Sequence, residues 1–227
     1  MIEFVYAKEL KEKFSVYGHF YCNDMGIDGR FACRSVLEIV SKNDSICKDD
    51  ILNSLPDAVV IMMNPGSSVP LEVKPCEVYS AATIKTLTPE YVDTKPDTTQ
   101  YQIMRLMLLK KWEHVRVINL SDLRTPKSSE LFETLKKMNS LQHSIFSKKR
   151  KSELASKLNR KKKAPVICAW GLDNSLFGLI DMAKRALQGI AVIGFADNES
   201  SFQFRHASPQ KKSDKLEWLD YMLSVLP

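Results

Sequence analysis

The sequence predicts an α/β fold in which parallel strands alternate with helices. Four short apolar runs have the composition of strands that are covered on both faces. They span residues 58–63, 115–118, 166–169 and 190–195. Helical patterns separate these runs and span 98–111, 128–138, which starts with a serine cap, and 175–187. This alternation gives β-α-β units, so we expect a three-layer α/β sandwich with a four-stranded parallel central sheet.

A β-hairpin is expected before this core. Residues 15–22 and 30–40 are rich in aromatic and β-branched side chains, and they flank a turn at 23–29 that contains Gly and Asp. We therefore assign residues 1–50 to an N-terminal hairpin extension that lies beside the sheet.

The whole chain, residues 1–227, is expected to form one domain, because its length suffices for a sizeable core and nothing demands a second one. An amphipathic pattern over 213–226 predicts a C-terminal helix in segment 213–227. Four prolines between residues 70 and 96 predict that much of this segment is an irregular loop.

Composition argues against membrane, disulfide-linked and metal-dependent classes. No apolar run approaches the length of a membrane helix, and the first residues lack the features of a signal peptide, so we expect a cytoplasmic protein. The cysteines are odd in number and scattered, which favours reduced thiols. They are Cys22, Cys33, Cys47, Cys76 and Cys168. His19, Cys22 and Cys33 lack a second close pair that would complete a zinc site, so we expect no metal and no other cofactor.

The positive charge of the chain is concentrated in one segment. The net charge is +6, but residues 148–163 alone carry nine Lys or Arg against the single acid Glu153. Such a basic insertion, at 147–163, suits contact with a nucleic-acid backbone. The residues expected to make these contacts are Lys148, Lys149, Arg150, Lys151, Arg160, Lys161, Lys162 and Lys163. The alternative is a solvated helix that packs through Leu154, Ala155 and Leu158.

Polar or glycine-containing segments follow the predicted strands. They are residues 64–67, 119–122 and 170–171, with 206–209 some ten residues beyond the last strand. Open α/β sheets place their ligand sites at the carboxyl ends of parallel strands, so these segments predict one pocket built from several loops.

The residues of these segments carry a family resemblance. The motifs are Met62-Met63-Asn64-Pro65-Gly66, Val117-Ile118-Asn119-Leu120 with Leu123-Arg124-Thr125, Val166-Ile167-Cys168-Ala169-Trp170-Gly171, and His206-Ala207-Ser208-Pro209. Their order resembles that of the uracil-DNA glycosylase superfamily. It is also similar to a bacterial and phage domain family of unknown function, with an Asp-x-Thr segment that is Asp97-Thr98-Thr99 here. The resemblance covers roughly residues 30 to 209.

The resemblance implies roles for individual residues. Asn64 would orient a water molecule through its amide oxygen, although an amide is not a base near neutral pH. Asn119 would read the Watson-Crick edge of an extruded base, and His206 would stabilise the departing base. The turn residues Pro65, Gly66 and Ser67 are expected at the substrate with Ser208, which would contact phosphate. Trp170 is expected to pack in the core beneath the site.

Each motif also has a purely structural interpretation. Asn64 begins a segment that is typical of a tight turn, Asn119 can cap the turn that follows it, and His206 can be a surface loop residue. The match departs from the superfamily in two places: residues 67–71 contain no aromatic ring on which a base could stack, and 210–212 contain no apolar wedge. These departures favour single-stranded, modified or mononucleotide substrates over uracil in duplex DNA.

Two functional hypotheses follow. The protein is either an enzyme of glycosylase type that hydrolyses an N-glycosidic bond, or a non-catalytic module that binds nucleic acid or a nucleotide. A third and weaker alternative is that the strand-end loops bind a protein partner. No membrane partner is expected, and the oligomeric state is left open.

Overall fold

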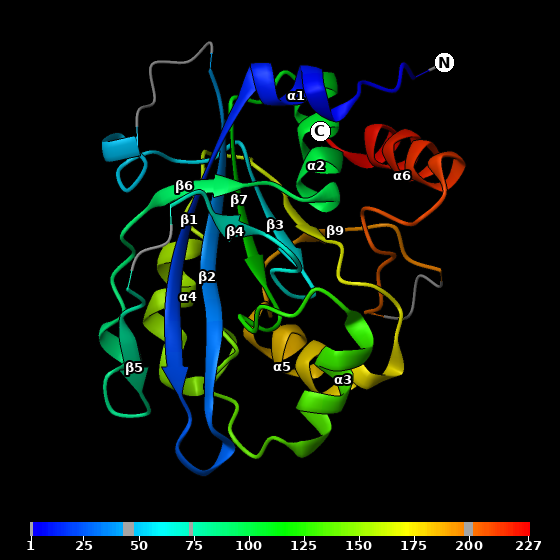
Figure 1. The fold of residues 1–227 in the computed structure, drawn as a ribbon. Helices are drawn as coiled ribbons and strands as arrows, with labels where there is room; N and C mark the ends of the chain where they lie inside the picture. The colour runs from blue at the N-terminus through cyan, green and yellow to red at the C-terminus, as the bar shows by residue number, and fades with distance from the viewer. Residues whose placement is uncertain (1, 43–47, 73–74, 198–201) are drawn as a thin grey trace.

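The protein has a mixed α/β fold built on one large sheet (Figure 1). The computed structural model describes residues 2–42, 48–72, 75–197 and 202–227. Cys47 of the sequence analysis lies outside this part of the chain. The strands are β1 (Phe14–Asp24), β2 (Arg30–Ser41), β3 (Ala58–Met62), β4 (Val69–Pro70), β5 (Val78–Ser80), β6 (Val92–Lys95), β7 (His114–Asn119), β8 (Val166–Cys168) and β9 (Val192–Ile193).

The sheet is wider than the sequence predicts, and its strands run in mixed directions. Its order is β4-β6-β1-β2-β7-β3-β8-β9, and β5 pairs with β1. Strand β3 pairs in parallel with β7 and β8, and β8 pairs in parallel with β9. The sequence predicts a separate four-stranded sheet with the hairpin beside it, but the hairpin is part of the sheet. Strand β2 pairs antiparallel with β7, with Leu37 opposite Val117. Figure 1 shows the hairpin as the longest pair of strands.

The expected hairpin is present, and it contains an irregularity that matters for the site. Strands β1 and β2 pair antiparallel, but the register shifts so that His19 faces Val36 and Phe20 faces Arg34. Ser35 is the extra residue of this β-bulge, so Arg34 and Val36 on either side of it point to opposite faces of the sheet, whereas regular alternation would put them on the same face. The bulge therefore places Arg34 on the face to which Phe20 points.

The segment at 70–96 is more regular than the sequence predicts. Strand β6 pairs with β1 and β4, and β5 pairs with the end of β1, so the segment extends the sheet at its edge. Pro70 lies in the short strand β4, where an edge position requires no hydrogen bond from its nitrogen. Strands this short contain too few residues to show an alternating pattern, and the four prolines of the segment favour the prediction of a loop.

Helices cover both faces of the sheet. They are α1 (Ala7–Lys13), α2 (Thr98–Lys110), α3 (Ser128–Lys137), α4 (Lys151–Lys157), α5 (Phe177–Ala186) and α6 (Lys212–Val225). Short 3-10 helices occupy Gly26–Asp28, Lys48–Asp50, Ile84–Thr86, Lys148–Arg150 and Asn174–Leu176. One hydrophobic core joins the sheet to α1, α2 and α6, and a second joins its other face to α4 and α5 (Figure 1).

The helix boundaries agree with the sequence to within a few residues, with one correction at α3. Its N-cap is Lys127, and no side chain caps the helix, so Ser128 is the first helical residue rather than the cap. Asp97, by contrast, caps α2 through a complete capping box with Gln100. This cap fixes Asp97 at the carboxyl edge of the parallel strands.

Candidate functional site

The turn after β3 holds Asn64 in one orientation. Its Nδ2 atom donates hydrogen bonds to the carbonyl oxygens of Leu123, at 3.1 Å, and Thr125, at 2.9 Å. Two carbonyl acceptors require the amide NH₂ on that side, so the Oδ1 atom is left as an acceptor for another group. Asn64 therefore links the loops after β3 and β7, and it retains the oxygen that positioning a water would require.

Gly66 brings the same turn against Asp97. Its φ angle is +64°, and a Cβ atom at this position would lie 2.8 Å from Oδ2 of Asp97. Both the backbone conformation and the close approach therefore require glycine. The other carboxylate oxygen of Asp97, Oδ1, accepts the N–H groups of Thr99 and Gln100. The cap thus holds the carboxylate so that Oδ2 lies at the turn after β3.

Asn119 is the last residue of β7, and it is completely buried. Strand alternation places it on the same face as Val115 and Val117, which pack beneath α2. Within the described part of the chain, neither its Oδ1 nor its Nδ2 has a hydrogen-bond partner. A buried polar atom left without a partner costs about 1–3 kcal/mol, so an amide with both atoms unpaired requires an explanation.

Arg34 is a second buried group without partners. It is fully buried, and its Nε and Nη1 atoms make no hydrogen bond to any described residue. Phe20 lies opposite it in the hairpin, and the guanidinium carbon of Arg124 lies 5.0 Å from the centre of the Phe20 ring. Nε of Arg124 donates to the carbonyl oxygen of Ser68 at 3.2 Å, and the Oγ of this buried serine also has no hydrogen-bond partner among the described residues.

The segment after β9 returns to the same edge. Ser208 donates its backbone N–H to Nδ1 of His206 at 3.2 Å, and its hydroxyl lies 3.4 Å from the carbonyl oxygen of Thr98 in the first turn of α2. Because Nδ1 accepts a hydrogen bond, the neutral imidazole of His206 carries its proton on Nε2. Burial lowers the pKa of His206, and Ser208 and Asp97 act in the opposite direction. His206 is therefore a neutral N–H donor at neutral pH.

We call these residues the strand-end cluster. It consists of Arg34, Asn64, Gly66, Ser68, Asp97, Asn119, Arg124 and His206. The chain thus brings the loops after β3, β7 and β9 close to the N-terminus of α2, while the single pocket that the sequence analysis expects from these loops stays a prediction. No hydrogen bond joins Asn64, Asn119 and His206 to one another in the described chain.

The remaining predicted site residues occupy different positions. Pro65 is buried and Ser67 is exposed, so Ser68, and not Ser67, turns inward. Trp170 is fully buried against the rings of Phe202 and Phe204, which confirms its expected place in the core.

The basic segment contains one clear correction. Arg150 was expected on a nucleic-acid backbone, but it is fully buried, and its Nη1 atom lies 2.7 Å from Oδ2 of Asp122. Glu153 pairs with the same guanidinium at 2.7 Å. Arg150 therefore anchors helix α4 to the rest of the fold through two carboxylates. The prediction was wrong because composition alone does not show that these carboxylates lie beside it.

The other basic residues divide into paired and exposed groups. Arg160 donates to the carbonyl oxygens of Ala164 and Leu158, and Lys161 pairs with Asp57 at 2.8 Å. The remaining lysines of the predicted contact set are exposed at the surface. They are Lys148, Lys149, Lys151, Lys162 and Lys163. Leu154 and Leu158 pack in the second core, as the alternative interpretation of this segment requires, whereas Ala155 is exposed.

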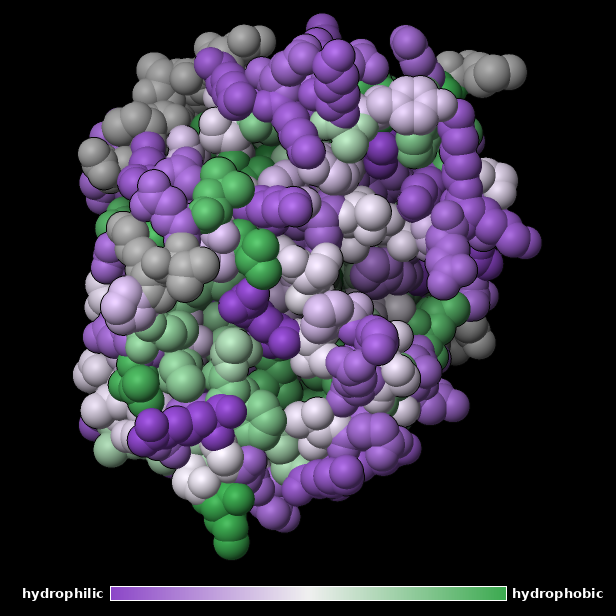
Figure 2. All heavy atoms as spheres, in the orientation of Figure 1, coloured by the Kyte–Doolittle hydropathy of each residue, from purple (hydrophilic) through white to green (hydrophobic). Residues whose placement is uncertain are grey.

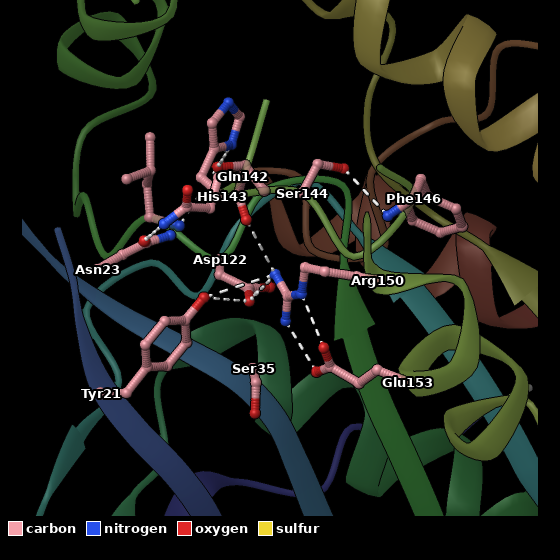
Figure 3. Close-up of polar contacts among 12 residues, drawn as sticks. Tyr21, Asn23, Ser35, Asp122, Gln142, His143, Ser144, Phe146, Arg150 and Glu153 are labelled. Atoms are coloured by element: carbon pink, nitrogen blue, oxygen red, sulfur yellow. Dashed lines mark hydrogen bonds and ion pairs between the residues drawn. The ribbon is translucent and has the colours of Figure 1, made fainter. Parts of the chain in front are cut away.

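A buried polar network surrounds Arg150 (Figure 3). The hydroxyl of Tyr21 donates to Oδ2 of Asp122 at 2.8 Å, and this carboxylate also accepts from Arg150. The figure shows Tyr21, from β1, and Arg150, at the start of α4, meeting at Asp122, while Glu153 binds the other side of the Arg150 guanidinium. Burial alone would lower the pKa of Arg150, but Asp122, Tyr21 and Glu153 hold it well above its ordinary value.

A large hollow lies beside this network, on the face covered by α4 and α5. Its volume is about 1180 Å³, and its lining combines Leu154 and Met182 with Lys148, Lys149 and Lys151. None of the strand-end cluster lines it. Figure 2 shows the face of the molecule that is seen in Figure 1. Hydrophilic side chains cover most of this face, and hydrophobic residues gather near the hairpin and β5.

Sequence reasoning assigned no role to four members of the cluster, of which Arg124 appears only within the motif Leu123-Arg124-Thr125. Arg34 and Ser68 carry no motif signal, because their burial depends on the bulge and on the turn after β3. Asp97 did have a signal: it belongs to the Asp-x-Thr segment and precedes a helical pattern with Gln three residues later, which is typical of a capping box.

Comparison with known proteins adds no relative. No family model, no curated protein and no solved structure matches this chain. Within the described residues, no group of three or more His, Cys, Asp or Glu side chains could hold a metal ion. None of the described helices is long and apolar enough to cross a membrane.

Proposed function

We propose that this protein recognises a nucleobase, presented by a nucleotide or a single-stranded nucleic acid, at the strand-end cluster. The observation that carries the proposal is Asn119, which is fully buried with both amide atoms unpartnered. A side-chain amide offers a donor and an acceptor side by side, which complements the donor and acceptor pattern on the edge of a base. A base that enters the cluster would satisfy both atoms.

Phe20 supports this proposal from a direction that the sequence does not reveal. No aromatic residue follows the turn at Asn64, but the hairpin places the half-buried Phe20 next to Arg34 and beneath Arg124. Flipped and single-stranded bases stack on aromatic rings. We assign Phe20 the stacking role for which residues 67–71 contain no candidate.

The cluster also contains the groups that N-glycosidic hydrolysis would use. Oδ1 of Asn64 would orient a water, and the carboxylate oxygen Oδ2 of Asp97 would accept its proton, which an amide cannot do. Nε2–H of His206 would donate to the departing base. The motif order that resembles the uracil-DNA glycosylase superfamily, and helices on both faces of the sheet, favour this reaction and a fold of that type.

A non-catalytic binding module is the second candidate, and the exposed lysines favour it. Lys148, Lys149 and Lys151 line the large hollow, and their charges are free to meet phosphates. This candidate predicts nucleic-acid binding that weakens steeply with salt. It requires no contribution from Asp97 or His206.

The deciding experiment combines base release with binding. Single-stranded and duplex oligonucleotides carrying uracil, hypoxanthine or a modified pyrimidine are incubated with the protein and with Asn119→Leu, Asp97→Asn and His206→Ala. Asn53→Leu, at an exposed asparagine, is the matched control. We expect Asn119→Leu to weaken binding of the base about 10- to 100-fold, the value of one or two buried hydrogen bonds.

The outcomes separate the candidates. Base release that is lost in Asp97→Asn and His206→Ala establishes the hydrolase. Salt-dependent binding without release, lost when Lys148, Lys149 and Lys151 are changed to Gln, leaves the binding module. Binding and release that are unchanged in Asn119→Leu would refute base recognition at the cluster.

A further inference from the structure

The two fully buried arginines of this protein have opposite surroundings. Arg150 has carboxylate oxygens of Asp122 and Glu153 at 2.7 Å each. Arg34 is equally buried, yet it forms no ion pair in the described chain, and two of its three nitrogens lack any hydrogen-bond partner. A buried cation without a partner is strongly unfavourable, and native proteins keep such groups where they bind something.

The surroundings of Arg34 leave its charge uncompensated. Asp97 and Asp122 are near enough to raise the pKa of Arg34, but burial outweighs them and lowers the pKa to about 10. Arg124, which contacts Phe20, adds a second positive charge on the same face. Asp122 is already paired with Arg150, so Asp97 is the carboxylate left to offset the charges of Arg34 and Arg124, and the ligand that suits these groups is an anion.

The buried position of Arg34 restricts the kind of anion. A phosphodiester within a nucleic-acid strand has a nucleotide on each side. A completely enclosed arginine can therefore bind it only if both flanking nucleotides can leave the site. A terminal phosphate needs a single exit. Arg34 is fully buried in the first half of β2, opposite Phe20 of β1. Asn119 ends the neighbouring strand β7, and strand alternation places its amide on the same face of the sheet.

We propose that the strand-end cluster binds a nucleoside monophosphate, with Arg34 on the terminal phosphate, Ser68 Oγ as a further donor, and Asn119 on the base. The base half of this ligand rests on the proposed function above. The anion half rests on Arg34 and Ser68 alone. Arg34 is a binding residue in this proposal and takes no part in bond cleavage.

The test compares inorganic phosphate, the nucleosides, and the matching nucleoside 5′-monophosphates as ligands of the intact protein, by thermal shift and calorimetry. At saturating ligand, about one hundred times Kd, we expect a monophosphate to raise Tm by roughly 5 °C. The matching nucleoside is expected to bind at least tenfold more weakly. Equal affinity of nucleoside and monophosphate would overturn the proposal, and so would the absence of any response to phosphate and monophosphates.

The variant Arg34→Met makes the test independent of folding defects. Methionine fills similar apolar volume without charge, so the ligand-free variant should have a Tm equal to or above that of the native protein, and it should lose the preference for the monophosphate. Arg105→Met is the matched control, because this buried arginine donates to Val5 O and Gln102 Oε1 and should be destabilised without loss of the preference. A large fall in Tm for Arg34→Met would show that the arginine is structural.

The two proposals fail in different ways. If inorganic phosphate stabilises the protein through Arg34 while no base improves binding, anion recognition stands and base recognition is wrong. If nucleosides bind as tightly as their monophosphates and Asn119→Leu abolishes this binding, base recognition stands and the role of Arg34 is wrong.

Discussion

Two buried histidines should make the stability of this protein fall between pH 7 and pH 5. His19 bonds to the hydroxyl of Ser35 at 2.7 Å, and His143 bonds to the hydroxyl of Ser121 at 2.9 Å. Burial lowers the pKa of each imidazole from 6.5 to about 4. The unfolded chain therefore binds more protons than the folded protein in this window, and acidification favours unfolding.

The magnitude follows from these two pKa values. For one group with a pKa of 6.5 when unfolded and about 4 when folded, the free energy of unfolding decreases by about 2 kcal/mol from pH 7 to pH 5. His206 acts in the same direction, because burial lowers its pKa as well. Asp122 has the opposite effect on the free energy of unfolding, because burial raises the pKa of its carboxyl to about 6 in spite of Arg150. The folded protein then takes up a proton at this group before the unfolded chain does, which favours folding as the pH falls.

Variants isolate the histidine contribution from the other titrating groups. Urea unfolding of the native protein, His19→Asn and His143→Asn is measured at pH 7, 6 and 5, with coincident fluorescence and circular dichroism transitions as the check for two-state behaviour. Each variant should reduce the loss between pH 7 and pH 5 by about 2 kcal/mol. Lys149→Gln, at an exposed position, is the control and should leave the pH dependence unchanged. A histidine variant with the native pH dependence would refute the reasoning.

Two further predictions concern the turn after β3 and the buried network. Gly66→Ala should destabilise the protein by about 1–3 kcal/mol, because its φ is positive and the new methyl group would meet Asp97. Gly178→Ala, in an α-helix with open space around it, should instead stabilise by about 0.5–1 kcal/mol, and thermal unfolding of the pair checks the contrast. Arg150→Met should cost about 3–5 kcal/mol in urea unfolding because it leaves Asp122 buried without its cation, whereas Lys149→Met should change stability by less than about 0.5 kcal/mol. A loss for Arg150→Met no larger than that for Lys149→Met would contradict the structural role of Arg150.

Periodicity in the sequence predicted those elements whose cause is local. The hairpin, the strand that ends at Asn119 and the helix that follows Asp97 all lie where alternation, apolar runs and helix signals place them. Each of these signals arises from residues within one element. The sheet that joins them does not, because the pairing of β2 with β7 brings together segments some eighty residues apart.

The residues that sequence reasoning missed depend on long-range structure. Arg34 lies directly before the bulge at Ser35, so the strand pattern alone gives its side chain no definite face. Arg150 sits among eight other basic residues, and its partner Asp122 lies 28 positions earlier. Phe20 can take the stacking role that we propose for it only because the hairpin joins the main sheet. In each case the decisive neighbour comes from another element.

The loop after β7 divides the buried polar groups of this protein into two sets with different tasks. On one side, Asp122 is fixed by Tyr21 and Arg150, so this part of the loop is held by internal hydrogen bonds. On the other side, the carbonyl oxygens of Leu123 and Thr125 fix Asn64. The paired network thus holds the loop in place, and the loop in turn orients a cluster in which Arg34, Ser68 and Asn119 have side-chain polar atoms without partners among the described residues. A preorganised binding site requires this arrangement, in which groups with complete hydrogen bonds support the groups that are left without partners. This division underlies the contrast that we propose, in which the paired Arg150 stabilises the fold and the unpaired Arg34 binds a ligand.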